Sequence, residues 1–167
     1  PELAGGPAGS PQREGGQPDR LSALMTVSQA MIHTLELDTI LGTVVREVRR
    51  VFQADESTVF LYDPSEQLLK PAACDLEDYK EEVMALRLRL GEGITGAVAL
   101  SGMAEIINRA SDAPRALQVP GTPADDPSSL LAVPLHSNGR VVGVITLVRL
   151  DGRPFSFAGH EYLRAIY

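Results

Sequence analysis

The sequence predicts an α+β fold built around one central antiparallel sheet. Residues 130–135 and 141–148 are two apolar runs of strand length, rich in β-branched side chains. Asn138 and Gly139 lie between them and favour the positive φ values of a tight hairpin turn, so the two runs should pair antiparallel. The second run is apolar almost throughout, which predicts that both faces of the sheet are covered. Helical patterns near both chain ends provide cover for one face.

Composition limits the class of protein. The chain has 167 residues, 44% of them apolar, which fits one domain with an ordinary core. The net charge of −7 argues against nucleic acid and anionic membrane as partners, because both require clustered Lys and Arg. No apolar run approaches the ~20 residues that span a bilayer. Cys74 is the only cysteine, so no internal disulfide can form and we expect a cytoplasmic protein.

The two ends of the chain predict a linker at the N-terminus and a truncated helix at the C-terminus. Residues 1–18 contain five Gly and four Pro, so we expect a disordered linker there and a single domain over residues 19–167. The chain begins without Met and stops within a helical pattern. We therefore expect a piece of a longer protein, truncated within its C-terminal helix.

Two helices are predicted before the first strand. Asp19 is a candidate N-cap for a helix over residues 20–35, and Asp38 for another over 38–52. The first helix has a wide apolar stripe, which packs either on the sheet alone or also on a partner helix. Part of that stripe would be exposed on a monomer, so we predict a homodimer through the terminal helices. The expected dimer interface consists of Leu21, Leu24, Met25, Met31 and Ile32.

The middle of the chain alternates strands with short helices. Asp63 and Pro64 favour a type I turn between the strands predicted at 57–62 and 68–74. Pro134 cannot donate a ladder hydrogen bond, so its strand should be irregular or at an edge there. The remaining elements, in chain order, are a short helix over 76–86, a strand over 86–90 with Arg87 and Arg89 facing solvent, a short helix ending near 101, a strand over 105–108 and a helix over 155–167.

Residues 91–96 match the pattern G-x-G-x-x-G after a predicted strand. We reject a dinucleotide site, because the following helix is about eight residues long and a βαβ crossover needs ~10–12. Glu92 would also place a negative charge in a phosphate cradle. The glycines are better explained by a tight strand-to-helix turn. The backbone N–H groups of Ile94 and Thr95 remain candidate donors to an anionic ligand group.

Residues 109–129 form a long polar segment with four Pro, three Asp and three Ser. A loop of this length inside a compact domain is usually functional or disordered. Arg109 and Arg115 are candidates for charge-assisted hydrogen bonds to an anionic or carbonyl-bearing ligand. The alternative is that these arginines pair with acidic residues of the same loop, which are Asp112, Asp125 and Asp126.

Three sequence blocks resemble a GAF domain. They are L-x-L-G-x-G-I-x-G-x-V-A at 88–99, S-L-L-A-V-P-L at 129–135, and G-x-V-V-G-V-I at 139–145 followed by Phe155 and Ser156. The resemblance covers roughly residues 21–167. It implies a six-stranded antiparallel sheet with the terminal helices on one face, and with short helices and loops enclosing a small-molecule pocket on the other. The ligand-binding residues expected from this arrangement are Ile94, Thr95, Arg109, Arg115, Ser129 and Val133.

The resemblance implies a non-catalytic regulatory domain of a bacterial signalling protein, attached to an output domain. Several departures restrict its cofactors. Cys74 is followed by Asp75 rather than His, which argues against bilin. Arg149 and Leu150 stand where cyclic-nucleotide members have Asn-Lys, so a cyclic nucleotide is unsupported. The three histidines, at 33, 136 and 160, are isolated in sequence, which argues against haem ligation.

Two alternatives remain. The first is a ligand-free dimerising spacer, in which the domain's own side chains fill the pocket. The second is a free methionine sulfoxide reductase, which shares this fold. That enzyme uses several cysteines, and Cys74 has no second cysteine in this chain with which to form a disulfide.

Overall fold

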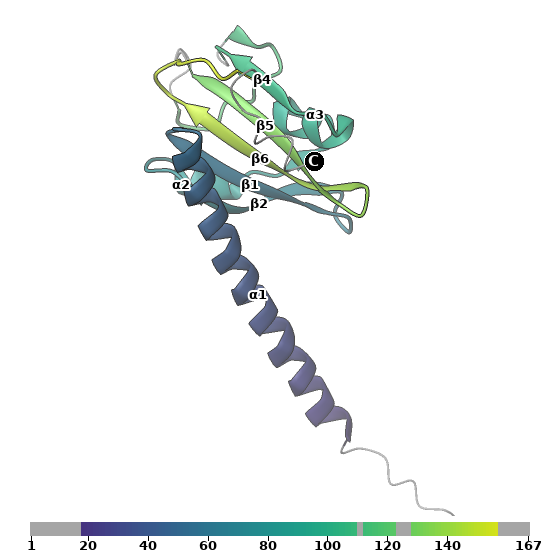
Figure 1. Cartoon of the computed structure of the whole chain (residues 1–167). Coiled ribbons are helices and arrows are strands. Elements are labelled where there is room, and N and C mark those ends of the chain that lie inside the picture. The colour runs from purple at the N-terminus through teal and green to yellow at the C-terminus, as the bar shows by residue number, and fades with distance from the viewer. Residues whose placement is uncertain (1–17, 110–111, 123–127, 157–167) are drawn as a thin grey trace, which may run out of the picture. The chain divides into compact units, whose positions relative to one another are not determined.

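Six strands form one antiparallel sheet in the order β3-β2-β1-β6-β5-β4 (Figure 1). The computed structural model describes residues 18–109, 112–122 and 128–156. The strands are β1 (Glu56–Asp63), β2 (Leu68–Asp75), β3 (Leu88–Arg89), β4 (Glu105–Asn108), β5 (Ser129–Ser137) and β6 (Arg140–Arg149). The predicted α+β class and the six-stranded antiparallel sheet are therefore confirmed.

The central hairpin forms as its sequence predicts. Asn138 and Gly139 join β5 to β6 with φ values of 51° and 74°. The pairing of β4 with β5 runs from Ser129 to Ala132, so it ends two residues before Pro134. Pro134 lies opposite Val144 of β6. Pro134 therefore lies in the part of β5 beyond the pairing with β4, which agrees with the expected local edge.

Helix α1 is one continuous helix, Pro18–Val51. The prediction of two helices with Asp38 as an N-cap is wrong. Residues 35–39 contain neither Gly nor Pro, and an Asp is tolerated inside a helix at a modest cost when the chain is already helical. Contacts divide the chain into two compact units at residues 36 and 37.

Two apolar cores cover the two faces of the sheet, as the apolar β6 sequence predicts. The α1-side core comprises Val45, Phe52, Ala54, Val59, Leu131, Val133, Ile145, Leu147 and Phe155. The α3-side core comprises Phe60, Leu69, Leu88, Ile94, Val98, Ala99, Ala132 and Val144. Neighbouring residues of one strand, such as Val144 and Ile145, fall in different cores because strand side chains alternate.

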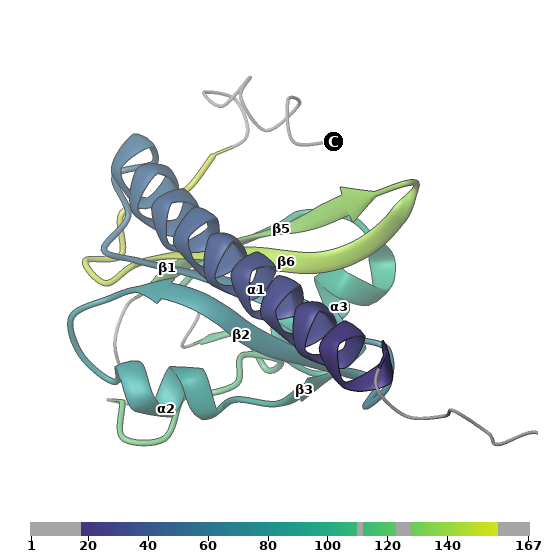
Figure 2. The same cartoon turned by 90° about the horizontal axis from the view of Figure 1, so that it is seen from below.

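The other two helices of the described residues are short. Helix α2 is Lys80–Ala85 and contacts β2, whereas α3 is Gly93–Ser101 and contacts β5 and β6. Figures 1 and 2 show α2 and α3 well separated, near opposite ends of the strands. Helix α2 is shorter than predicted because Tyr79 takes a left-handed conformation immediately before it. Strand β3 also has only two residues, and Arg87 and Arg89 are exposed as expected.

Some predictions lie outside the described residues. The predicted linker falls mainly on residues 1–17, and the predicted C-terminal helix falls mainly on residues 157–167. Within the part of the chain that is described, none of the helices combines the length and apolar character needed to cross a membrane.

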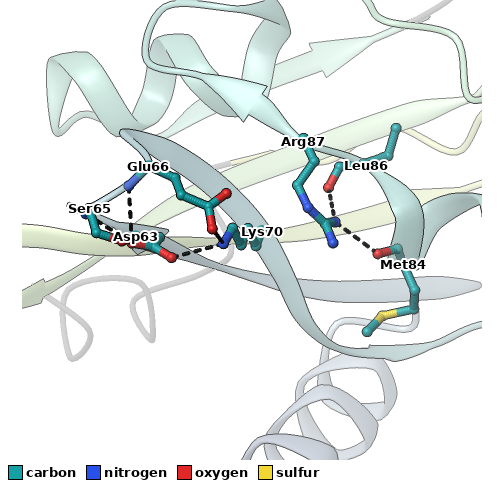
Figure 3. A network of polar contacts seen from close by, with 7 residues as sticks. All are labelled: Asp63, Ser65, Glu66, Lys70, Met84, Leu86 and Arg87. Atoms are coloured by element: carbon teal, nitrogen blue, oxygen red, sulfur yellow. Dashed lines mark hydrogen bonds and ion pairs between the residues drawn. The ribbon is translucent and has the colours of Figure 1, made fainter.

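The β1–β2 turn is fastened by Asp63, as its sequence predicts (Figure 3). Its Oδ1 accepts hydrogen bonds from the Ser65 N–H at 2.9 Å and from the Ser65 hydroxyl at 2.5 Å. Lys70 Nζ donates to Asp63 Oδ2 at 2.8 Å and to Glu66 Oε1 at 2.6 Å. The hydrogen bonds from Lys70 and Ser65 hold the pKa of Asp63 well below its usual range.

Candidate functional site

The glycine motif forms a tight turn that positions the first turn of α3. Gly91 N–H donates to the Gly96 carbonyl at 2.8 Å, and a Cβ on Gly96 would lie 2.3 Å from the Arg89 carbonyl oxygen. Glu92 Oε2 accepts a hydrogen bond from the Arg89 N–H at 2.8 Å. Glu92 therefore fastens the turn, and the close backbone approach explains the glycine at position 96. This confirms the structural explanation of the motif.

The described part of the long loop, residues 112–122, lies over the start of α3. Leu117 is above Gly93, where an added Cβ would come within 2.7 Å of Leu117 Cδ1. Arg115 Nη2 lies 3.1 Å from Glu105 Oε2 of β4. Ala116 packs against the α3-side core. This loop segment therefore covers the α3 side of the sheet.

A row of side chains crosses that face of the sheet under α2, α3 and the loop. Thr58 pairs with both Cys74 and Thr146 in the strand register. Thr146 also pairs with Ala132, which in turn pairs with Glu105. Ala132 belongs to the α3-side core, and paired residues of adjacent strands point to the same face. We call Cys74, Thr58, Thr146, Ala132 and Glu105 the polar row.

The polar row brings hydrogen-bonding groups into an apolar environment. Thr58 and Thr146 are each 6% exposed. The Thr146 hydroxyl donates to the Thr58 backbone carbonyl at a long 3.4 Å. Burial raises the pKa of the Cys74 thiol, so this cysteine lacks the stabilised thiolate of a reactive site. The row can donate and accept hydrogen bonds, and its Glu105 end faces Arg115 of the loop.

Three of the predicted ligand-binding residues lie on this face. The Ile94 side chain is part of the α3-side core, and Thr95 follows it in the first turn of α3. The Arg115 carbonyl oxygen lies 3.6 Å from the position of a Cβ on Gly93, so Arg115 borders the same turn. The structure thus brings together Ile94, Thr95 and Arg115.

The other three predicted residues lie elsewhere. Val133 belongs to the α1-side core. Ser129 lies an even number of positions away on β5, so its side chain points to the same face, and its hydroxyl donates to the Gly152 carbonyl at 3.4 Å. These two residues therefore lie on the α1 side of the sheet, away from Ile94, Thr95 and Arg115, because the face of β5 toward α3 carries Leu130 and Ala132 instead. Arg109 is exposed and its Nε lies 3.3 Å from Asp112 Oδ2. The Arg109–Asp112 ion pair agrees with the alternative prediction for this residue, in which the arginine pairs with an acidic residue of the same loop.

The polar row is what the sequence analysis missed. Thr58 and Thr146 interrupt two strands that are otherwise rich in apolar residues, and this was the available signal. Their pairing with each other, and with Cys74 and Glu105, depends on strand order and register, which the sequence patterns do not provide. Among the described residues, no group of three or more His, Cys, Asp or Glu side chains could hold a metal ion.

Helix α1 exposes apolar side chains along its length. In the unit that ends at residue 36, Met25 is 61% exposed and Met31 is 62% exposed. The side chains of Leu21, Leu24 and Ile32, the other predicted interface residues, lie outside those that the structure describes. In the second unit, four α1 side chains are 36–59% exposed at helical spacing. We call these the α1 stripe: Leu37, Ile40, Val44 and Val51.

Comparison with known sequences identifies regulatory relatives. Residues 34–166 match a family model described as the GAF domain. The Nif-specific regulatory proteins of Azospirillum lipoferum and Azospirillum brasilense are each 30% identical over 134 residues, which is 78% of this chain and 21% of theirs. The chain thus spans about a fifth of the length of these relatives.

Solved structures show the same fold. The GAF domain of an Acinetobacter phosphoenolpyruvate-protein phosphotransferase has a TM-score of 0.65 at 23% identity, covering 90% of this chain and 89% of that one. A type II free methionine-R-sulfoxide reductase from Thermoplasma acidophilum has a TM-score of 0.64 at 17% identity, covering 80% and 88%. The GAF family model matches most of the length of this chain, so the chain belongs to the GAF domain family.

Proposed function

We propose that this chain is a non-catalytic regulatory domain that senses a small molecule held on the polar row, beneath loop residues 112–122. The observation that carries the proposal is the pair of buried threonines, Thr58 and Thr146, at the centre of an apolar sheet face. Buried polar groups are costly unless they are hydrogen-bonded, and the bond between these two residues is long. A ligand that accepts from Thr146 would replace a weak contact with a stronger one.

The electrostatics of the site indicate the chemistry of the ligand. Arg115 and Glu105 lie 3.1 Å apart at one end of the row and both are partly exposed. The first-turn backbone donors at Ile94 and Thr95 lie at the start of α3, where the helix dipole favours negative charge. These groups favour a ligand with an anionic or carbonyl oxygen at this end and a hydrogen-bonding group over the threonines.

The curated relatives support a regulatory role. They are named as Nif-specific regulatory proteins, and the matched region is a small part of their length. By analogy, we propose that this domain acts in the cytoplasm and controls an output domain elsewhere in its own protein. A reductase function is disfavoured, because the chain has one cysteine and burial raises the pKa of its thiol.

Native mass spectrometry of the protein purified from cells tests the sensing proposal. We expect the wild type to retain a small molecule, and the Thr58→Val/Thr146→Val variant to lose it, because valine keeps the shape and removes the hydroxyl. The matched control is Thr43→Val, which changes an exposed threonine of α1 whose hydroxyl bonds only within that helix, donating to the Thr39 carbonyl and accepting from Arg46 Nη2. Retention in all three proteins, or in none, would contradict a ligand on the polar row.

A second function, self-association, is favoured by the α1 stripe. Leu37, Ile40, Val44 and Val51 leave apolar area exposed beside the helix face that packs on the sheet. Exposed apolar surface of this kind is costly and typical of an interface. We propose that two copies of the chain associate through α1, with Met25 and Met31 extending the contact toward the N-terminus.

Light scattering at micromolar concentration tests the association. We expect a dimer for the wild type, and a monomer for Leu37→Glu/Ile40→Glu, because two carboxylates would be desolvated at the interface. The control variant Thr39→Glu places one charge on a neighbouring exposed position of α1 outside the stripe and should leave the dimer intact. A wild type that is monomeric throughout this range would contradict the proposal.

A further inference from the structure

The loop over the polar row is anchored by two side chains that point away from it. Strand β4 ends at Asn108 and β5 begins at Ser129, so the loop leaves the sheet at one and returns at the other. Asn108 and Ser129 are also partners in the β4–β5 register. The neighbouring Ile107 and Leu130 pack on the α3-side core, so Asn108 and Ser129 point to the opposite face.

Both side chains bind the segment that follows β6. Phe155 N–H donates to Asn108 Oδ1 at 2.9 Å, and Asn108 Nδ2 donates back to the Phe155 carbonyl at 3.2 Å. The Ser129 hydroxyl donates to the Gly152 carbonyl at 3.4 Å. We call residues 150–156 the exit segment, and Asn108 with Ser129 the clamp. The clamp therefore joins both ends of the loop to one stretch of chain on the other side of the sheet.

Arg149 extends this connection to α1. Its Nη1 donates to the Pro154 carbonyl at 2.6 Å, and its Nη2 donates to the Phe52 carbonyl, just beyond the end of α1, at 2.7 Å. The guanidinium carbon lies 4.1 Å from the centre of the Phe155 ring. The exit segment is thus held at the same place by the clamp and by an arginine bound to the end of α1.

We propose that the clamp relays the state of the loop to the exit segment and, through Arg149, to the end of α1. The inference rests on the proposed regulatory function and assigns Asn108 and Ser129 as positioning residues. Because each clamp residue is an end of the loop, displacement of the loop shifts the atoms that hold Gly152 and Phe155. The clamp's hydrogen bonds then weaken, and the exit segment detaches from the sheet more often.

Hydrogen exchange of the Phe155 amide, measured by NMR, tests this relay without any ligand. The variant Arg115→Gln/Leu117→Ser removes two contacts of the loop, with Glu105 and with Gly93. We expect the Phe155 amide to exchange about fivefold faster, as loss of one net hydrogen bond implies. The matched control, Arg87→Gln/Leu100→Ser, makes the same changes at exposed positions outside the loop and should leave this exchange unchanged.

The clamp variant Asn108→Ala completes the test. Its Phe155 amide should exchange fast already, and the loop substitutions should then add nothing. If Asn108→Ala does not fold, Asn108→Leu serves instead, because it keeps the size of the side chain and removes both the acceptor for the Phe155 N–H and the donor to the Phe155 carbonyl. Faster exchange confined to residues 112–122, or equal increments with and without the clamp, would overturn the relay. Neither result depends on a retained ligand, so a failed relay is distinguishable from a failed sensing function.

Discussion

Replacing Ile145 with alanine is expected to lower the free energy of unfolding by about 2–5 kcal/mol. Ile145 is 3% exposed in the α1-side core and pairs with Val59 on one side and Val133 on the other. Both partners belong to the same core, so removal of the Ile145 side chain leaves a cavity between them. The strands β1, β6 and β5 cannot close this cavity without breaking the backbone hydrogen bonds that join them. Chemical denaturation measures the loss.

Val142→Ala is the control for this substitution. Val142 lies on the same strand and is 38% exposed, so its truncation should change the free energy of unfolding by about 0.5 kcal/mol or less. A loss for Ile145→Ala as small as that of the control would contradict the burial of β6 on its α1 side.

Gly96→Ala is expected to destabilise the domain by about 1–3 kcal/mol, although alanine is the better helix former. Two effects compete at this position. Alanine inside a helix gains about 1 kcal/mol over glycine. Against this, its Cβ would lie 2.3 Å from the Arg89 carbonyl oxygen, a backbone atom that cannot rotate away. The steric cost should therefore prevail, as thermal or chemical unfolding would show.

Gly42→Ala makes the same change where space is open. The nearest atom to an added Cβ there is the end of the Arg46 side chain, at 3.7 Å. We expect a gain of up to about 1 kcal/mol in the free energy of unfolding. If Gly96→Ala were stabilising to the same degree, the close approach of α3 to Arg89 would be contradicted.

The parts of the fold with local signals were predictable from the sequence. Asn138 and Gly139 determine the hairpin because the turn needs residues that tolerate positive φ. The β4 strand at Glu105–Asn108 was also predicted with the observed bounds. The junction in α1 was not, because Asp38 suits both an N-cap and an exposed helix interior, and only the surrounding chain decides between them.

The site was predictable only in part, for a reason that lies in β5. Its sequence is apolar on both sides, so alternation shows that neighbouring residues face opposite ways without showing which core each one joins. Ser129 and Val133 lie on the α1 side of the sheet, whereas Ala132 faces α3. Ile94 and Thr95 lie on the α3 side because the glycine turn that positions them is a local feature of the sequence, and their role in binding stays a prediction.

The short pairing of β4 has a consequence for aggregation. An uncovered strand edge can template the addition of a strand from another molecule. The outermost strands of the described sheet, β3 and β4, have two and four residues, which leaves little ladder to extend. Beyond the residues that pair with β4, strand β5 contains Pro134, which has no N–H to offer an incoming strand. At this edge of the described sheet, both features shorten the ladder that an incoming strand could extend.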